Sequence, residues 1–201
     1  MNDGPHVKKL GIVLKPTANV FESQAVLSPT CFQEGEFVHL FYRAVDQDNS
    51  SSIGYAKLEG PTKVVERWNY PIIAREHDYE IKGVEDPRLS KIGRTFYLTY
   101  VAHDGKNALT AYATSRDLKN FQKKGIISPR IRYHELKNLF EESGDKRLKD
   151  AYFFFAAFYE EGAGEDVLIW HKDVILFPKK INKQFAMLNR VLPDIQIVFF
   201  N

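Results

Sequence analysis

The sequence has little cysteine and no long hydrophobic run. Cys31 is the single cysteine among 201 residues, which excludes a disulfide within the chain and fits a reducing compartment. No apolar run approaches the roughly 18 residues of a membrane-spanning helix. Residues 1–6 lack the positive charge that precedes the apolar core of a signal peptide. We therefore expect a cytoplasmic protein without a membrane span, with Cys31 buried in a strand.

A strong net charge and the common metal and nucleotide motifs are also absent. The formal net charge is +2, too small to indicate nucleic acid binding. The six histidines form neither HxxxH nor HExxH, and GxGxxG, GxxxxGK[ST] and GxSxG do not occur. These absences argue against zinc, nucleotide and serine-hydrolase chemistry. We expect no metal, no organic cofactor and no nucleic acid partner.

Aromatic residues in strand-like runs are abundant. They make up 13% of the chain, with 15 Phe and 10 Tyr, and they suit the pleated surface of a β-sheet. A β-rich core is the simplest explanation, and sugar-stacking side chains are the alternative. Strand-like runs separated by polar turns predict two hairpins. Their strands are expected at 37–44, 53–58, 96–102 and 109–114.

The two hairpins belong to an internal repeat with a constant offset. The interval from Pro29 to Arg43 equals the interval from Pro87 to Val101. A weaker third copy occupies 173–190. Repeated groups of antiparallel strands are typical of propeller blades, whereas a β-sandwich would not give this matched spacing.

We therefore predict an all-β fold of the propeller type, in a single catalytic domain over residues 1–201. A propeller needs at least four blades, and about three are present, the last of them ending in a strand-like run at 195–201. The expectation is an incomplete propeller. Because exposed edge strands pair with other chains, a homo-oligomer is also expected.

Residues 130–166 break the repeat. Leu136, Leu139 and Phe140 are spaced for one face of a helix, and an aromatic block follows at 152–159. We predict a helical and aromatic insertion over 130–166, with an interaction surface as an alternative role.

The segment Gly83–Arg88 is the most informative in the chain, because two adjacent acids precede a proline. Pro87 disfavours the helical region for Asp86, so this carboxylate is expected on an extended, stiff corner that opens into a strand. Asp86 is the candidate general acid. The alternative is a turn residue paired with Arg88. Glu85 is expected to point to the opposite face, as neighbours in a strand do.

Other polar residues are candidates for ligand binding. Arg43 ends a predicted strand, where its fork suits sugar hydroxyls or phosphate, or an ion pair with Asp46 or Asp48. Asp104 is a tight-turn residue at a position equivalent to the loop after Arg43. Basic residues gather around the third copy, where they suit an anion such as phosphate or a solvated face. They are Lys172, Lys179, Lys180 and Arg190.

Four motifs in order resemble glycoside hydrolase family 130, the β-mannoside phosphorylases and related β-mannosidases. They are Tyr42–Ala44, Gly83–Arg88, Ala113–Phe121 and Lys172–Ile181. The resemblance runs from about Ala25 to the C-terminus, interrupted by 130–166. It implies a five-bladed β-propeller, of which this chain would hold roughly the first three blades.

The resemblance also implies the chemistry. Asp86 would be the general acid, and inorganic phosphate would attack the anomeric carbon with inversion to give α-mannose 1-phosphate. One carboxyl then suffices, because phosphate replaces the base-activated water of an inverting glycosidase. The implied ligands of the sugar are Ser28, Arg43, Glu85, Arg88 and Asp104, and those of phosphate are Lys180, Asn189 and Arg190.

The chain departs from the family pattern at three of its motif positions. Ser28 stands where asparagine is usual, Lys179 where glutamate is usual, and Asn189 where histidine is usual. These departures leave two alternatives to phosphorolysis, which are hydrolysis of β-mannosides by the same fold and a catalytically inactive fragment that binds sugar.

Overall fold

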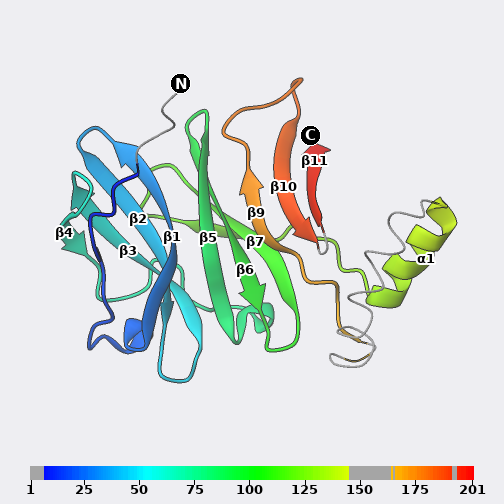
Figure 1. The fold of residues 1–201 in the computed structure, drawn as a ribbon, viewed down its shortest axis with the longest axis horizontal. Helices are drawn as coiled ribbons and strands as arrows, with labels where there is room; N and C mark the ends of the chain where they lie inside the picture. The colour runs from blue at the N-terminus through cyan, green and yellow to red at the C-terminus, as the bar shows by residue number, and fades with distance from the viewer. Residues whose placement is uncertain (1–6, 145–163, 165, 192–193) are drawn as a thin grey trace.

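The computed structural model describes residues 7–144, 164, 166–191 and 194–201 (Figure 1). The described chain is mostly β-structure, as predicted, and its one α-helix is α1, Tyr133–Ser143. Two short 3-10 turns, Val20–Glu22 and Asp78–Glu80, precede the first and second groups of strands. The strands are β1 (Ala25–Glu34), β2 (Phe37–Val45), β3 (Ser51–Glu59), β4 (Lys63–Arg67), β5 (Gly83–Ile92), β6 (Thr95–His103), β7 (Ala108–Ser115), β8 (Gln122–Ile126), β9 (Lys172–Leu176), β10 (Phe185–Val191) and β11 (Asp194–Phe200).

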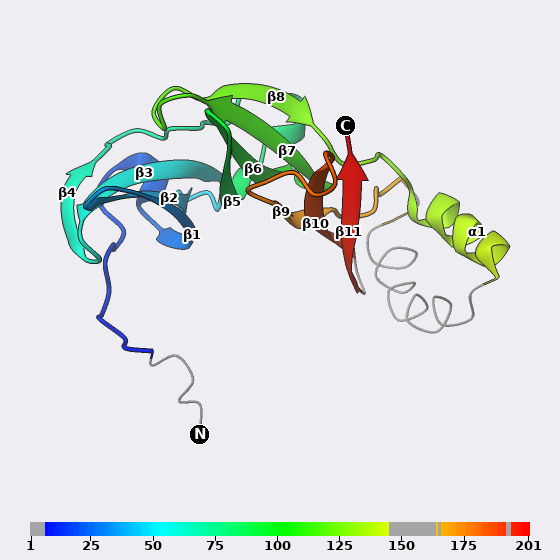
Figure 2. The same ribbon diagram turned by 90° about the horizontal axis from the view of Figure 1, so that it is seen from above.

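The strands form three antiparallel groups. Strands β1 to β4 and β5 to β8 each pair in sequence order, and one parallel pair, Ser51 with Gly83, joins them into an eight-stranded sheet. Strands β9 to β11 form a separate sheet. Figure 2 shows the three groups following one another along the molecule. The first two groups repeat strand for strand, because the interval between the starts of β1 and β5 equals that between the starts of β2 and β6.

The first strand of each group carries the same β-bulge. Its partner strand advances two residues while it advances three, between Leu27 and Thr30, between Glu85 and Arg88, and between Lys172 and Ile175. The residue after the first of each pair has a positive φ: 46° at Ser28, 47° at Asp86 and 54° at Asp173. A bulge bends the strand and re-aims a side chain. The repeat therefore extends to a third copy and places these three residues at equivalent positions.

The first two groups also share a buried carboxylate. Glu22 is fully buried and accepts hydrogen bonds from Tyr42 and Arg67, each at 2.7 Å. In the second group the fully buried Glu80 accepts from Tyr100 at 2.8 Å and from Lys123 on β8. A buried charge is tolerated when it is paired and hydrogen-bonded. Each group thus ties the turn before its first strand to its second and fourth strands.

The main core lies within the eight-stranded sheet and explains much of the aromatic content. Phe41, Tyr55 and Tyr100 are almost completely buried there together with Ile53 and Leu98. The third group docks on this sheet through hydroxyl donors. Thr99 donates to the backbone oxygen of Val174 at 2.6 Å, and Ser90 donates to that of Leu176, both on β9. Thr110 donates to the backbone oxygen of His171, the residue before β9, at 2.7 Å.

Helix α1 lies within the range where a helical segment was predicted. Gly144 ends it in the left-handed conformation, with φ of 71°, which glycine adopts without strain. Leu136 packs against a small core of Tyr133, Val167 and Ile169, whereas Leu139 is 55% exposed. The side chain of Phe140 and the aromatic block at 152–159 lie outside the described residues.

The prediction that Cys31 is buried is wrong, because its side chain is exposed. Strand β1 has exposed residues at alternate positions, and Cys31 lies on that outward face. Within the described part of the chain, no helix is long and apolar enough to span a membrane.

Candidate active site

Asp86 occupies a strained corner of β5. Its φ of 47° lies in the left-handed region, where residues other than glycine are uncommon, although Asp and Asn are enriched among them. Such strain costs on the order of 1–3 kcal/mol and persists only where the surroundings impose it. Pro87 follows inside the same bulge. The prediction of an extended corner before the strand is wrong, because the bulge inside β5 gives Asp86 a left-handed conformation.

Arg43 lies against both acids of the Glu85-Asp86 pair. Its Nη2 donates to Glu85 Oε1 at 2.7 Å, its Nε donates to Ser51 at 2.9 Å, and its Nη1 lies 3.7 Å from Asp86 Oδ1. The expectation that Glu85 points away from Asp86 is wrong, because the bulge interrupts the alternation of side chains. Both carboxylates therefore contact one guanidinium.

Two structural alternatives considered for these residues are also contradicted. Asp46 pairs with Arg75 at 3.6 Å rather than with Arg43. Arg88 pairs with Asp173 at 3.3 Å rather than with Asp86.

The carboxylate of Asp86 is only partly satisfied. Its Oδ1 is buried and accepts no hydrogen bond from any described residue. Buried polar atoms almost always have a partner, so this oxygen is suited to a ligand that brings a polar group to it. The positive charge of Arg43 lies at one side of the same oxygen.

Asp173 gathers the arginines on the other side of β5. Its Oδ1 accepts from Arg88 Nη2 at 3.3 Å, and its Oδ2 lies 2.9 Å from Arg190 Nη2. Arg190 on β10 is paired in register with Lys172 on β9. Sequence reasoning did not assign Asp173 a role, although aligning the third copy with Glu85-Asp86 would have found it.

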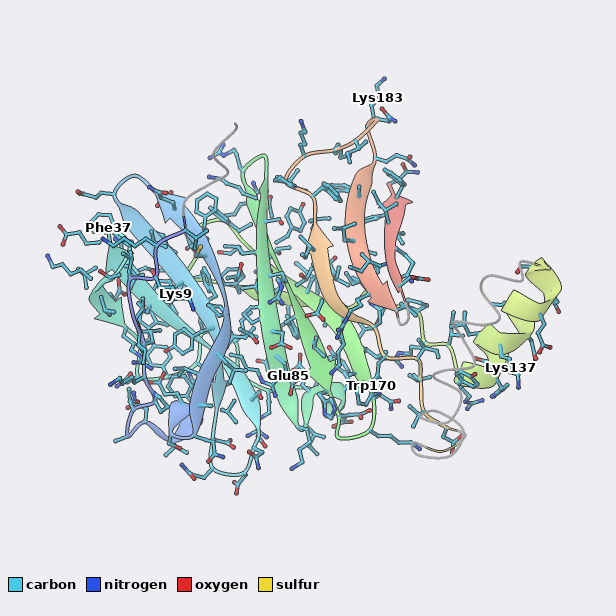
Figure 3. All side chains as sticks on the ribbon, in the orientation of Figure 1. Lys9, Phe37, Glu85, Lys137, Trp170 and Lys183 are labelled. Carbon is cyan, nitrogen blue, oxygen red and sulfur yellow. The ribbon has the colours of Figure 1, made fainter. Side chains whose placement is uncertain are left out.

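His103 lies near the charges of Glu85, Lys172, Asp104 and Arg43. It ends β6 opposite Gly83, and its Nδ1 accepts from Gly105 N at 3.0 Å. Burial lowers the pKa of His103 below its usual value, with Glu85 opposing this effect and Lys172 adding to it. Its ring meets Trp170 edge to face at 6.2 Å between centroids, and Lys172 stacks over Trp170 at 4.5 Å. Figure 3 shows Glu85 and Trp170 in the same part of the molecule.

Two further candidates, Ser28 and Asp104, belong to the first two groups of strands and differ in their contacts. Ser28 takes the position in β1 that Asp86 takes in β5. Asp104 is occupied by its own turn, since it accepts from the backbone N of Lys106 at 2.8 Å and of Asn107 at 2.6 Å. Burial would raise the pKa of Asp104, but the hydrogen bonds from Asn107 and Lys106 outweigh it and lower the pKa.

Two of the predicted phosphate residues are not brought together with Arg190. Lys180 lies in the β9–β10 loop, where it stacks over Phe185 at 4.2 Å. Lys183, in the same loop, is at the end of the hairpin remote from Glu85 (Figure 3). Asn189 is buried, while its neighbour Arg190 is exposed on the opposite face of β10. The Oδ1 of Asn189 accepts no hydrogen bond within the described ranges.

The described residues contain no group of three or more His, Cys, Asp or Glu side chains arranged to hold a metal ion. The arrangement offers instead the Asp86 carboxyl group, whose buried Oδ1 accepts no hydrogen bond from the described residues and lies 3.7 Å from Arg43. Such a site suits proton transfer to a neutral polar substrate next to an anion.

The chain is similar in sequence to known glycoside-cleaving proteins. The profile of glycoside hydrolase family 130, described as beta-1,4-mannooligosaccharide phosphorylase, matches residues 6–200. Two similar proteins come from Thermoanaerobacter sp. (strain X514). A 1,2-beta-oligomannan phosphorylase is 27% identical over 198 residues, covering 93% of this chain and 53% of that protein. A beta-1,2-mannobiose phosphorylase is 28% identical over 193 residues, covering 88% and 51%.

The chain spans about half the length of the curated relatives it matches. A solved glycosyl hydrolase from Bacteroides ovatus has a similar fold, with a TM-score of 0.69 at 18% identity. The likeness covers 96% of this chain and 55% of that one.

Proposed function

The chain belongs to glycoside hydrolase family 130, and on that premise we propose that it cleaves β-mannosides by phosphorolysis with inversion, releasing α-mannose 1-phosphate. The proposal applies to the whole enzyme if this chain is part of a longer one. The observation that carries it is the buried Oδ1 of Asp86 on a strained bulge, which lies 3.7 Å from Arg43 and accepts no hydrogen bond from the described residues. A β-mannoside and inorganic phosphate are the proposed substrates.

Asp86 acts as the general acid. Its carboxyl group donates a proton to the glycosidic oxygen as the bond from that oxygen to the anomeric carbon breaks. An oxygen of hydrogen phosphate forms the new bond to the anomeric carbon from the opposite face, which inverts the configuration. The proton that hydrogen phosphate loses restores the carboxyl group of Asp86, so atoms and charge balance.

Arg43 binds the mannosyl unit. Its guanidinium is held by Glu85 and Ser51, and a planar fork fixed in this way is suited to sugar hydroxyls. Glu85 orients Arg43, and Ser28 lies at the matching bulge of the first group.

Arg88, Lys172 and Arg190 supply the anion side. Arg88 and Arg190, from β5 and β10, meet at Asp173, and Lys172 precedes Asp173 on β9. Charge-assisted hydrogen bonds to phosphate are among the strongest in proteins. The sequence predicted Lys180, Asn189 and Arg190 as the phosphate ligands and Arg88 as a ligand of the sugar. The positions of Lys180 in the hairpin loop and of Asn189 on the buried face of β10 favour Lys172 in place of Lys180.

Hydrolysis of β-mannosides is the second candidate. An inverting hydrolase needs a second carboxylate to activate water. Asp173 is the one carboxylate near the anion side among the described candidates, and both of its oxygens already contact arginines, which favours phosphate as the nucleophile. An inactive sugar-binding protein is the third candidate.

The fold proposed for the whole domain is a five-bladed propeller. The two equivalent four-stranded antiparallel groups, and the third group with the same bulge, support it. The three groups correspond to consecutive blades.

Product analysis tests the proposed function. The chain is incubated with β-1,2-mannobiose and with β-1,4-mannobiose, each with and without inorganic phosphate. Mannose 1-phosphate formed only with phosphate is the expected result. Free mannose released equally in both conditions would identify the hydrolase. No product in either condition from folded protein would contradict cleavage of β-mannosides by this chain.

A further inference from the structure

Asp173 stands out because no step of the proposed reaction uses it. We propose that Asp173 is a positioning residue that holds Arg88 and Arg190 together as one phosphate-binding pair. The inference rests on the proposed function. Its two carboxylate oxygens are divided between the two arginines, with Oδ1 3.3 Å from Arg88 and Oδ2 2.9 Å from Arg190.

The two arginines come from different sheets. Arg88 is on β5, in the strand that carries Asp86, and Arg190 is on β10 in the third group. The carboxylate between them is therefore the link that sets the distance between two cations delivered by separate elements. Placing cations at a fixed separation is how a protein binds a tetrahedral anion through several hydrogen bonds at once.

The backbone at Asp173 supports a dedicated role. Its φ of 54° and its bulge repeat those of Asp86, so the strand bears the same strain at both positions. Strain of this kind is retained where a side chain must be aimed in one direction. In β5 it aims a carboxyl group at the sugar, and in β9 it aims one at the arginines.

Hydrogen bonds other than those of this carboxylate also dock the third sheet on the first. Hydroxyl groups of Thr99, Ser90 and Thr110 already fix β9 and its preceding residue to the first sheet. Asp173 is also 30% exposed on its side chain, unlike the fully buried Glu22 and Glu80. Its contribution therefore falls on the arginines rather than on the stability of the fold.

Both arginines keep donor groups for a ligand. Arginine has five N–H donors in a fixed fork. Asp173 uses the Nη2 group of each, and Arg88 directs Nη1 to the backbone oxygen of Pro87 at 2.9 Å. The contacts with Asp173 thus fix the plane of each guanidinium and leave further N–H groups to meet phosphate.

The variant Asp173→Asn gives opposite results for positioning and for simple charge. Asparagine tolerates a positive φ and keeps the shape, but it loses the charge and one acceptor. If Asp173 only lowers the local positive potential, its removal will strengthen phosphate binding. If it positions the arginines, phosphate binding will weaken, by about tenfold for a coupling of ordinary size, with kcat and the KM for the mannoside changed less than about twofold.

The measurements are the Kd of inorganic phosphate by calorimetry and the KM for phosphate in steady state. Asp194→Asn is the matched control, since it removes the same charge from an exposed residue of the same sheet; its Kd should equal that of the unmodified chain. An unchanged or lower Kd for Asp173→Asn would overturn the proposal, as would an unmodified chain that binds no phosphate. Phosphate binding without turnover would instead contradict the proposed function, while the Kd comparison would still decide the role of Asp173.

Discussion

Ser28 and Asp86, which occupy equivalent positions of the repeat, adopt the same left-handed backbone conformation, with φ of 46° and 47°. Each is followed by proline and each stands in a bulge of the first strand of its group. The chain therefore presents two equivalent corners, one with a hydroxyl and one with a carboxyl group. Serine is the less suited of the two to a positive φ, because Asp and Asn are enriched there.

The first prediction concerns Ser28→Asn. Because asparagine fits the conformation of residue 28 and offers an amide to the sugar, we expect the KM for the mannoside to fall about threefold or more. The free energy of unfolding should be equal or higher, by up to about 1 kcal/mol. Steady-state kinetics and urea titration measure both. A raised KM with unchanged stability would show that Ser28 itself makes the better contact.

The second prediction concerns Glu85→Gln, which keeps the shape of the side chain and removes its charge. Glu85 accepts from Arg43 at 2.7 Å, and a hydrogen bond between charged groups contributes about 1.5 kcal/mol or more. We expect kcat/KM for the mannoside to fall about tenfold, chiefly through KM. Glu59→Gln is the control, since Glu59 makes an ion pair with Lys63 elsewhere in the same sheet. Equal values of kcat/KM for the two variants would show that Glu85 has no role in binding the mannoside.

The third prediction concerns the buried carboxylates Glu22 and Glu80. Removing one partner of a buried ion pair destabilises a protein by about 3 kcal/mol. We expect a loss of that size for Glu22→Gln and again for Glu80→Gln, measured by urea unfolding. The two losses should add in the double variant, because the two networks share no partner. The exposed Glu34 supplies the control variant Glu34→Gln, and a loss below about 1 kcal/mol at either buried site would contradict the prediction.

Glu22 adds a pH dependence at the acid end. Burial would raise its pKa, but hydrogen bonds from Thr17, Tyr42, Arg67 and Asn19 outweigh burial and lower the pKa below 4.5. A lowered carboxyl pKa stabilises the folded state above the unfolded pKa and loses that contribution as pH falls through the folded one. The Glu22→Gln variant should therefore lose less stability than the unmodified chain below about pH 4.5.

The fourth prediction concerns His171 at a higher pH. Burial lowers the pKa of His171 from 6.5 to about 4, so between these values the unfolded chain binds a proton that the folded chain excludes. Stability is therefore complete above pH 6.5 and falls as pH decreases toward 4. Between pH 7 and pH 5, the titration of His171 lowers the free energy of unfolding by about 2 kcal/mol.

Urea unfolding of His171→Gln at those two pH values measures this contribution. The variant should lose about 2 kcal/mol less than the unmodified chain on going from pH 7 to pH 5, whatever its stability at pH 7. His134→Gln, at an exposed position of α1, should behave like the unmodified chain. An unchanged slope for His171→Gln would show that His171 titrates normally in the folded state.

The strands and their repeat were predictable because both depend on short-range patterns in the sequence. Hydrophobic runs separated by polar turns predicted β2, β3, β6 and β7 to within a few residues. The spacing of Pro29 and Pro87 reflects two equal bulges. The proline after Asp86 predicted a stiff corner there, but not its left-handed conformation.

The side-chain contacts of the site were less predictable, because they depend on long-range geometry. Glu85 contacts Arg43 because a bulge cancels strand alternation, which the hydrophobic pattern does not reveal. Arg88 meets Asp173 from a strand of another sheet, far away in the sequence. Lys180 and Arg190 are close in sequence, but the hairpin places Lys180 in its loop and Arg190 at the far end of β10.

The central claim is that Asp86 is the proton donor of a phosphate-dependent cleavage. The rate of mannose 1-phosphate formation from β-mannobiose and phosphate, compared between the unmodified chain and Asp86→Asn, tests it most directly. Asparagine accepts the positive φ of residue 86, so the variant should unfold at the same temperature within a few degrees. We predict a loss of rate of about 10²–10⁴, the usual contribution of a general acid. A folded Asp86→Asn variant that forms mannose 1-phosphate within about threefold of the unmodified rate would contradict the claim.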